Sequence, residues 1–359
     1  MLTASSWMLM PDLAFRCHSN PIFKPADIRP SHPGLHVECL LNPGVFRYGG
    51  RIGMVLRVAE RPMQTDAEVS TPIHDPSAPG GIRILKVRRD DPDLILDDSR
   101  VFRWKGEHYL TTLSHLRLAW SDDGVRFTAD PDPILTGTGP LETFGLEDCR
   151  VTSQADGTYV LTYTVVSPAG VAVGCATTRD WISFEQLGVI LPPHNKDCAI
   201  FDRMIDGRFW CLHRPSGLGL GGHYLWIASS PDRLHWGRHH CIARTRPGHW
   251  DSERIGAGAP PIRIPEGWLE IYHGSDGKRY CLGALLLDAD DPTRVLARSR
   301  DPIMEPIAPY EQTGFFGHVV FTNGHVVDGD DLTLYYGAAD EVVCQAKMSI
   351  REILTTLSE

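Results

Sequence analysis

Charged residues recur at the starts of predicted strands, where they could combine proton transfer with the binding of an anion. A carboxyl group can pass a proton, and lysine or arginine can hold an anion by charge-assisted hydrogen bonds. Acid–arginine pairs can also simply brace neighbouring repeats. We favour bracing for Asp98 and Arg100 and a functional role for the group around Asp148. The aligned segments are Asp98-Ser99-Arg100, Glu147-Asp148-Cys149-Arg150, Asn195-Lys196-Asp197 and Arg254-Ile255-Gly256.

An internal repeat supplies the elements that would position these residues. The pattern Ser/Thr-x-Asp-x-x-x-aromatic begins at Ser121, Thr178 and Ser230, each time after an apolar run. Ser and Asp side chains hydrogen-bond their own backbone, so each copy predicts a tight turn before a strand. A charged residue followed by glycine precedes aromatic-rich strands and predicts hairpins. Its copies are Lys105-Gly106, Asp156-Gly157, Asp206-Gly207, Glu266-Gly267 and Asp328-Gly329.

Repeated units with about four short strands each are typical of a β-propeller. The 34 Gly and 27 Pro among 359 residues also favour many turns over long helices. We therefore predict an all-β, five-bladed β-propeller. Its units would cover 40–100, 100–150, 150–200, 200–255 and 255–345. The innermost strand of each blade lines a central funnel, where five charged residues should meet. These are Asp98, Asp148, Lys196, Arg254 and Asp340.

The remaining segments lack the repeat. We predict an N-terminal extension over residues 1–35, a catalytic propeller domain over 36–345 and an inserted loop over 62–92. Residues 346–359 carry apolar residues at helical spacing and predict a short C-terminal helix on the same domain.

Composition excludes several classes of protein. The net charge of −10 argues against general binding to nucleic acid or to an anionic membrane, but permits a small basic pocket. Nine scattered cysteines without a C-x-x-C pair indicate reduced thiols. No basic n-region opens the chain and no apolar run is long enough to span a bilayer. We expect a cytoplasmic protein, which could form a homo-oligomer.

Seven segments, in order, resemble glycoside hydrolase family 130, which comprises β-mannoside phosphorylases and some β-mannosidases on a five-bladed propeller. They are GLEDCRV (145–151), HNKD (194–197), LHRPSG (212–217), RIGAGAPPI (254–262), GWLEIYHG (267–274), ALLLDADDPTRVLARSRDPIMEP (284–306) and YYGAAD (335–340). The resemblance covers roughly residues 40–350.

The resemblance implies that Asp148 is the catalytic proton donor, with Cys149 where the family usually has Pro. An acid active near neutral pH needs a raised pKa, which we expect from burial beside Glu147. We expect Glu147 to brace Arg150. A phosphorylase needs one such carboxyl group, because phosphate is already an anionic nucleophile, whereas an inverting hydrolase needs a second to activate water.

By the same resemblance, five residues bind phosphate: Lys196, Arg214, Arg254, His273 and Tyr280. Asn42, Arg57 and Asp340 are implied to hold the sugar at the cleaved bond. Glu147, Arg150, Asn195 and Asp197 complete the implied substrate-binding set. We expect Phe144, Tyr272 and Trp120 mainly in the core. Without H-x-H or H-E-x-x-H spacing we predict no metal site, and no cofactor beyond phosphate as co-substrate.

We therefore expect inverting phosphorolysis of a β-1,2- or β-1,4-mannoside, giving α-mannose 1-phosphate. One alternative is a β-mannosidase that uses Glu253, Asp197 or Asp98 as base. Another is a non-catalytic carbohydrate-binding propeller, with its funnel plugged or Asp148 held in a salt bridge. A third is a different five-bladed glycosidase with three funnel carboxylates, against which the basic set counts.

Overall fold

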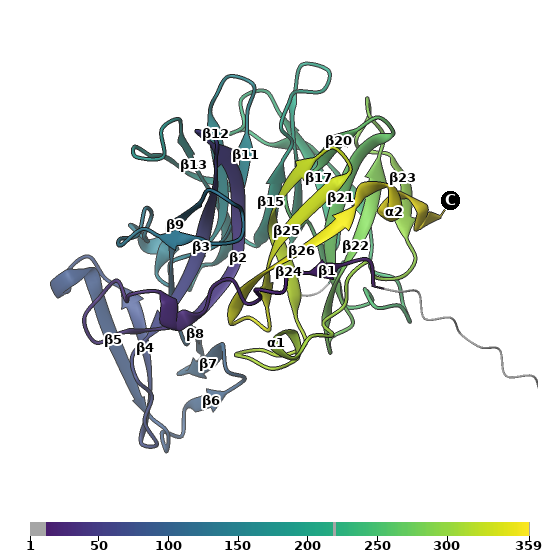
Figure 1. The fold of residues 1–359 in the computed structure, drawn as a ribbon. Coiled ribbons are helices and arrows are strands. Elements are labelled where there is room, and N and C mark those ends of the chain that lie inside the picture. Colours follow the sequence, from purple (N-terminus) through teal and green to yellow (C-terminus); the bar gives the residue numbers. More distant parts are fainter. Residues whose placement is uncertain (1–11, 218–219, 359) are drawn as a thin grey trace, which may run out of the picture.

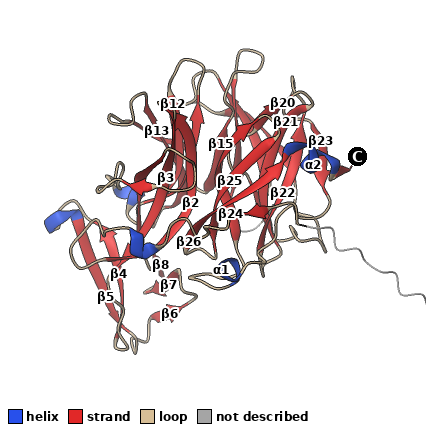
Figure 2. Ribbon diagram, in the orientation of Figure 1, coloured by secondary structure: helices blue, strands red, loops and turns tan. Residues whose placement is uncertain are grey.

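The computed structural model describes residues 12–217 and 220–358, and the fold there is all-β (Figure 2). The α-helices are short: α1 covers Pro309–Gln312 and α2 covers Ile350–Thr355. Three single 3-10 turns lie at Pro25–Asp27, Pro79–Gly81 and Pro140–Glu142. The first part of the predicted N-terminal extension, residues 1–11, lies outside the described residues. No helix of the described chain is long and apolar enough to cross a membrane.

Five large antiparallel sheets follow one another along the chain (Figure 1). The first contains β2 (His36–Tyr48), β3 (Arg51–Arg61), β9 (Leu113–Ser121) and β10 (Thr128–Ala129). The second contains β11 (Leu146–Ser153), β12 (Tyr159–Ser167), β13 (Gly170–Thr178) and β14 (Glu185–Leu191). The third contains β15 (Asn195–Ile200), β16 (Phe209–Pro215), β17 (Leu225–Ser230) and β18 (Gly237–Ala243).

Each of the last two sheets includes a short strand from one end of the described chain. The fourth contains β19 (Arg254–Gly256), β20 (Ile262–Ile264), β21 (Gly267–Ser275), β22 (Tyr280–Leu287), β23 (Val295–Ser299) and β27 (Leu357–Ser358). The fifth contains β24 (Val320–Asp328), β25 (Asp331–Ala338), β26 (Val342–Ser349) and β1 (Phe15–Arg16). Both ends of the described chain thus pair with strands of these sheets. The helix predicted over 346–359 is shorter than expected: residues 346–349 belong to β26, and only Ile350–Thr355 form α2.

The predicted turns are confirmed. Ser121, Thr178 and Ser230 end the third strand of their sheets, and each side-chain oxygen accepts backbone hydrogen bonds from the turn that follows. The aspartate two residues on accepts two more backbone N–H groups, as Asp123 does from Val125 and Arg126. Side chains thus satisfy the turn backbone between the third and fourth strands in three sheets.

The predicted unit boundaries are wrong in two places. Residues 62–112 form one insertion in the first sheet, with hairpin β4 (Glu68–His74) and β5 (Ile82–Arg88). Its second part is a small sheet of β6 (Leu94–Leu96), β7 (Val101–Trp104) and β8 (Glu107–Leu110). Lys105-Gly106 forms the β7–β8 hairpin, so the insertion contains the same charged residue–glycine turn as the repeated units. Figure 1 shows it projecting from the side of the molecule. The last unit, 255–345, contains two sheets.

Neighbouring sheets contact one another, and in four of the five the first strands themselves are in contact. Strand β2 contacts both β24 and β11, and β11 contacts β15. The third and fourth sheets meet through β16 and β19, and the fourth and fifth through β22 and β24. Buried clusters span these junctions; one joins Leu269 and Leu282 of the fourth sheet to Val320 and Leu334 of the fifth. Packing between sheets therefore fixes where the first strands stand.

Candidate active site

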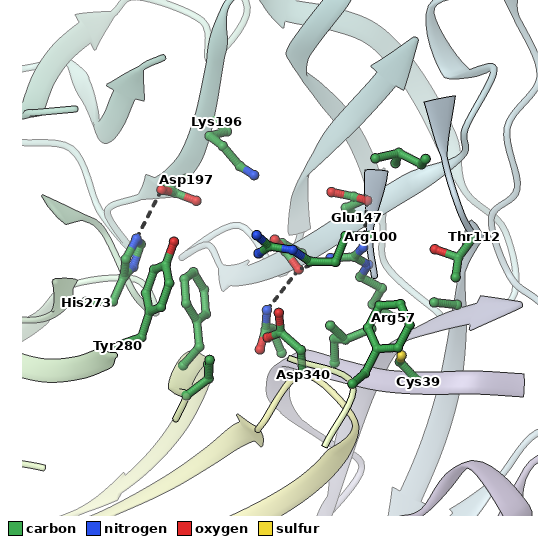
Figure 3. Close-up of a pocket in the computed structure, with 18 of the residues that line it drawn as sticks. Cys39, Arg57, Arg100, Thr112, Glu147, Lys196, Asp197, His273, Tyr280 and Asp340 are labelled. Carbon is green, nitrogen blue, oxygen red and sulfur yellow. Dashed lines mark hydrogen bonds and ion pairs between the residues drawn. The ribbon is translucent and has the colours of Figure 1, made fainter. Parts of the chain in front are cut away.

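A cavity of about 230 Å³ is lined by residues from the first strands of all five large sheets (Figure 3). All predicted site residues except Arg150 and Asn195 line it. Other strands of these sheets contribute further lining residues, namely Arg57 of β3, Arg214 of β16, His273 of β21 and Tyr280 of β22. Trp120, Phe144 and Tyr272 do not line the cavity; Phe144 and Tyr272 are buried in the core, as expected.

Shifts in strand pairing direct three of these side chains toward the cavity. The pairing register of β2, β11 and β15 shifts at Leu41/Gly44, Glu147/Arg150 and Lys196/Ala199. Inside the shifts lie Asn42, Asp148 and Asp197, with φ of 33°, 50° and 54°. Asn and Asp tolerate positive φ better than most residues, and a bulge redirects a side chain. Three sheets thus repeat one device that delivers a short polar side chain to the cavity.

Asp148 is buried, and one of its oxygens is held firmly. Oδ1 accepts hydrogen bonds from Arg57 Nη1 at 3.0 Å and from Asn42 Nδ2 at 3.1 Å. Among the described residues, none donates a hydrogen bond to Oδ2. A salt bridge to Asp148 is one of the two features expected of a non-catalytic carbohydrate-binding protein, and the pair with Arg57 is such a bridge. The other feature, a plugged funnel, does not apply to the described residues, because the cavity is open. The second carboxyl oxygen of Asp148 can still bind a ligand.

The expectation of a raised pKa for Asp148 is wrong for this structure. Burial does raise the pKa, but the charges of Arg57, Lys196 and Arg150 lower it more, and the pKa lies below its ordinary value. Glu147 does not brace Arg150 either. Its carboxylate accepts a hydrogen bond from Arg57 Nη2 at 2.6 Å, so Arg57 bridges both acids.

Arg150 lies beneath the site rather than in it. It is almost fully buried, and its Nε and Nη2 donate to the carbonyls of Gly258 and Ala257 at 2.6 and 2.7 Å. A third hydrogen bond, of 3.3 Å, runs from Nη2 to Asp197 Oδ1. These backbone acceptors lie between β19 and β20 of the fourth sheet and draw the side chain away from the cavity. The predicted substrate contact is therefore corrected to a role in joining sheets.

Asp197 organises the basic end of the cavity. Its Oδ2 lies 3.1 Å from Arg214 Nε. The same oxygen lies 3.3 Å from His273 Nε2 (Figure 3). Burial opposes ionisation, but Arg214, His273 and Arg150 hold the pKa of Asp197 well below its usual range. Its side chain is 0% exposed, so it positions cations instead of contacting sugar as predicted. Burial lowers the pKa of His273 to about 4, leaving a neutral imidazole at pH 7.

Several donors at this end have no partner among the described residues. Arg214 Nη1 and Arg254 Nε are buried without a hydrogen-bond acceptor. Lys196 extends toward the middle of the cavity, and Tyr280 lies beside His273 with its hydroxyl facing inward (Figure 3). Buried N–H groups without acceptors are costly, and an anion would satisfy them. This end is therefore suited to a phosphate-sized anion.

Asp340 lines the cavity and lies below Arg100 in the view of Figure 3. Burial raises its pKa to about 6; Arg100 and Arg57 oppose the rise, while Asp148 and Glu147 add to it. Asp340 thus stays partly protonated in a mildly acidic solution. Its carboxyl group can exchange hydrogen bonds with a sugar hydroxyl in either form.

Two further predictions are corrected. Asn195 precedes Lys196 in β15, and successive side chains of a strand point to opposite faces. Its side chain meets His213 at 3.1 Å, in a second pocket. Asp98 pairs with Arg100 at 3.0 Å in the insertion and does not line the cavity. Arg100 itself does line it, together with Cys39, Thr112 and Phe315. The sequence pattern predicts only a bracing role for Arg100, because nothing in it indicates that this residue lines the cavity.

The site thus pairs buried carboxyl groups with unsatisfied cationic donors in an all-β protein. A sequence model described as beta-1,4-mannooligosaccharide phosphorylase, glycoside hydrolase family 130, matches residues 96–359. The chain therefore belongs to glycoside hydrolase family 130, a family of enzymes, which confirms the resemblance of its motifs.

Relatives extend this match over nearly the whole chain. A beta-1,2-mannobiose phosphorylase of Listeria innocua is 43% identical over 349 residues, which are 96% of this chain and 98% of the relative. A 1,2-beta-oligomannan phosphorylase of a Thermoanaerobacter species is 37% identical over 67% of this chain and 80% of the relative. The solved Listeria innocua beta-1,2-mannobiose complex is 42% identical, covers 96% of this chain and 99% of that one, and superposes with a TM-score of 0.93.

Proposed function

We propose that the five large sheets are the blades of a β-propeller. Support comes from their sequential order, from the contacts between neighbouring sheets and from the cavity that their first strands line together. Blade-like sheets around a common axis would bring residues that lie far apart in sequence, such as Asn42, Asp148 and Arg254, into one funnel. Residues 36–345 as one catalytic domain, a cytoplasmic location and a homo-oligomer stay predictions.

We propose that the enzyme cleaves β-1,2-mannobiose with inorganic phosphate and inverts the anomeric centre, giving α-mannose 1-phosphate and mannose. The β-1,2 linkage is favoured because two relatives named for that linkage match at 43% and 37% identity. The proposal rests mainly on the arrangement of the cavity, which has a carboxyl group on one side and basic residues on the other. Asp148 presents one free carboxyl oxygen beside Asn42, Arg57 and Asp340, and Lys196, Arg214, Arg254 and His273 gather next to it.

In this proposal Asp148 protonates the departing oxygen while the basic set holds phosphate in line with the anomeric carbon. The low pKa of Asp148 in the free protein is compatible with this role. Phosphate bound by Lys196 would offset the positive charge that lowers the pKa of Asp148, so its binding favours the protonated carboxyl group. Phosphate binding would then both supply the nucleophile and favour protonation of the acid, Asp148.

The hydrolytic alternative lacks a suitable base among the residues considered for it. Asp197 is buried against Arg214, His273 and Arg150, and Asp98 and Glu253 do not line the cavity. An inverting hydrolase needs a carboxylate free to activate water on the face opposite the acid. Cationic donors occupy the basic end instead.

Product analysis of the wild-type enzyme tests the proposal. β-1,2-Mannobiose and β-1,4-mannobiose are each incubated with and without phosphate, and sugars and sugar phosphates are separated by chromatography. We expect mannose 1-phosphate from the β-1,2 substrate, only in the presence of phosphate. Free mannose released at the same rate without phosphate would contradict phosphorolysis, and turnover of the β-1,4 substrate alone would contradict the linkage.

A further inference from the structure

The wall of the cavity facing away from the basic end is built largely by the insertion. Arg100, Val101, Leu110 and Thr112 line it, and Phe315 joins them from the segment between α1 and β24. In Figure 3, Thr112 and Cys39 lie on the side opposite His273 and Tyr280, with Arg100 and Asp340 between the two groups. The cavity thus has a polar middle flanked by a basic end and by a mixed, partly aromatic wall.

Arg100 is held in place before any ligand arrives. Its guanidinium lies over the ring of Phe316, 3.7 Å from the centroid, and its Nη2 pairs with Asp98 at 3.0 Å. Ser99 Oγ donates to the carbonyl of Phe315 at 2.9 Å, which ties the insertion to the Phe315–Phe316 segment. A guanidinium fixed by stacking and an ion pair loses little conformational freedom when it binds a ligand.

Among the described residues, only Nη2 of the three guanidinium nitrogens of Arg100 has a hydrogen-bond acceptor. Its Nε is buried and has no acceptor in residues 12–217 and 220–358. Arg100 and Asp340 both line the cavity and lie next to each other in Figure 3, and the charge of Arg100 lowers the pKa of Asp340. A hydroxyl group of a ligand lying between them could accept from Arg100 and donate to Asp340.

We propose that Arg100 and Phe315 form the subsite for the leaving sugar, with Arg100 as the residue that selects it. This inference rests on the proposed phosphorolysis. In an inverting displacement the nucleophile and the leaving group stand on opposite sides of the anomeric carbon, so phosphate at the basic end directs the leaving mannose to the wall of the insertion. Arg100 hydrogen-bonds its hydroxyl groups, and Phe315 packs against its ring.

The test uses Arg100→Gln in the synthetic direction, with mannose as acceptor and mannose 1-phosphate as donor. Loss of a charged hydrogen bond should raise the KM for mannose roughly 10- to 100-fold and leave the KM for mannose 1-phosphate within about twofold. Arg103→Gln is the matched control: Arg103 lies in the same insertion, pairs with Asp97 at 3.0 Å and does not line the cavity, so both constants should stay at wild-type values.

Phe316→Ala gives an independent reading, because it keeps Arg100 and removes its stacking surface. It should raise the same KM for mannose by a smaller factor. A raised KM for phosphate or mannose 1-phosphate, with that for mannose unchanged, would overturn the inference and assign Arg100 to the phosphate. Unchanged constants in both variants would also overturn it. Wild-type enzyme that forms no mannose 1-phosphate from either mannobiose would instead contradict the proposed function.

Discussion

Two carboxyl groups in one cavity differ in pKa because their neighbours differ. Asp148 has three cations close by, which outweigh the effect of burial and lower its pKa. Asp340 faces two cations and two carboxylates, so burial dominates and raises its pKa to about 6. The lowered pKa keeps Asp148 ionised at neutral pH, whereas the raised pKa lets Asp340 be neutral in mild acid. This contrast fits one acid that phosphate controls and one sugar-binding group.

Replacing Asp340 should make stability less dependent on pH. A carboxyl group with a pKa raised from 3.8 to about 6 stabilises the fold fully below pH 4, and that contribution is lost as the pH rises through 6. Asp340→Asn should therefore be more stable than wild type at pH 8, by at most about 3 kcal/mol, since one pKa unit is about 1.4 kcal/mol. The advantage should vanish near pH 4.

Urea denaturation at both pH values measures this difference, with Asp206→Asn on an exposed turn as control. An Asp340→Asn enzyme that is less stable than wild type at pH 8 would contradict the assignment. The same variant should bind mannobiose more weakly, because an amide accepts hydrogen bonds less strongly than a carboxylate.

The residue types of the site could be predicted from sequence, and their surroundings could not. Asp148, Lys196 and Arg254 are recognisable because each lies at the start of a strand in its unit. Arg150 and Asn195 were placed wrongly because a bulge and the alternation of a strand decide where their side chains point. Neither is visible in a one-dimensional pattern.

At the scale of elements, a short strand determines the geometry of the basic end. Strand β19 passes close to the buried Asp197 and His273 at Gly256. A Cβ atom there would lie 2.3 Å from Asp197 Oδ2 and 2.6 Å from His273 Cε1. Such separations are far below van der Waals contact, so glycine is required for the strand to approach the two side chains.

Gly256→Ala should therefore damage phosphate binding selectively. The methyl group must displace Asp197 or His273, so the KM for phosphate should rise roughly tenfold or more, as expected when a positioned charged contact is lost. Steady-state kinetics with varied phosphate and with varied mannobiose separates the two substrates. Gly237→Ala in β18 is the control, because a Cβ atom there meets nothing within 4 Å. A KM for phosphate unchanged from wild type would refute the positioning role.

Hairpins and tight turns could be predicted from sequence because their signals are local. The Ser-x-Asp turns and the charged residue–glycine hairpins depend on backbone groups within a few residues. Assigning the Lys105-Gly106 hairpin to the insertion requires knowing that β3 pairs with β9 across more than fifty residues. That pairing depends on long-range packing, so the sequence predicts the insertion only over residues 62–92 and does not place Arg100 at the cavity.

At the scale of the whole molecule, a protein with a negative net charge has several basic side chains around one cavity. The net charge is −10, yet Lys196, Arg214 and Arg254 come from two neighbouring sheets and face the same space. Their repulsion is offset by Asp197, which lies between Arg150, Arg214 and His273. The positive charge at this cavity thus comes from the local arrangement of residues, since the overall charge of the protein is negative.

The central claim is that Asp148 supplies the proton and phosphate supplies the nucleophile. The most direct measurement is a ³¹P NMR time course with β-1,2-mannobiose and phosphate, for wild type and Asp148→Asn. We predict α-mannose 1-phosphate as the first phosphorylated product of the wild type, and a rate lower by roughly 10²- to 10⁴-fold in the variant, the usual range for losing a general acid. A β anomer, or an Asp148→Asn enzyme with the wild-type rate, would contradict the account.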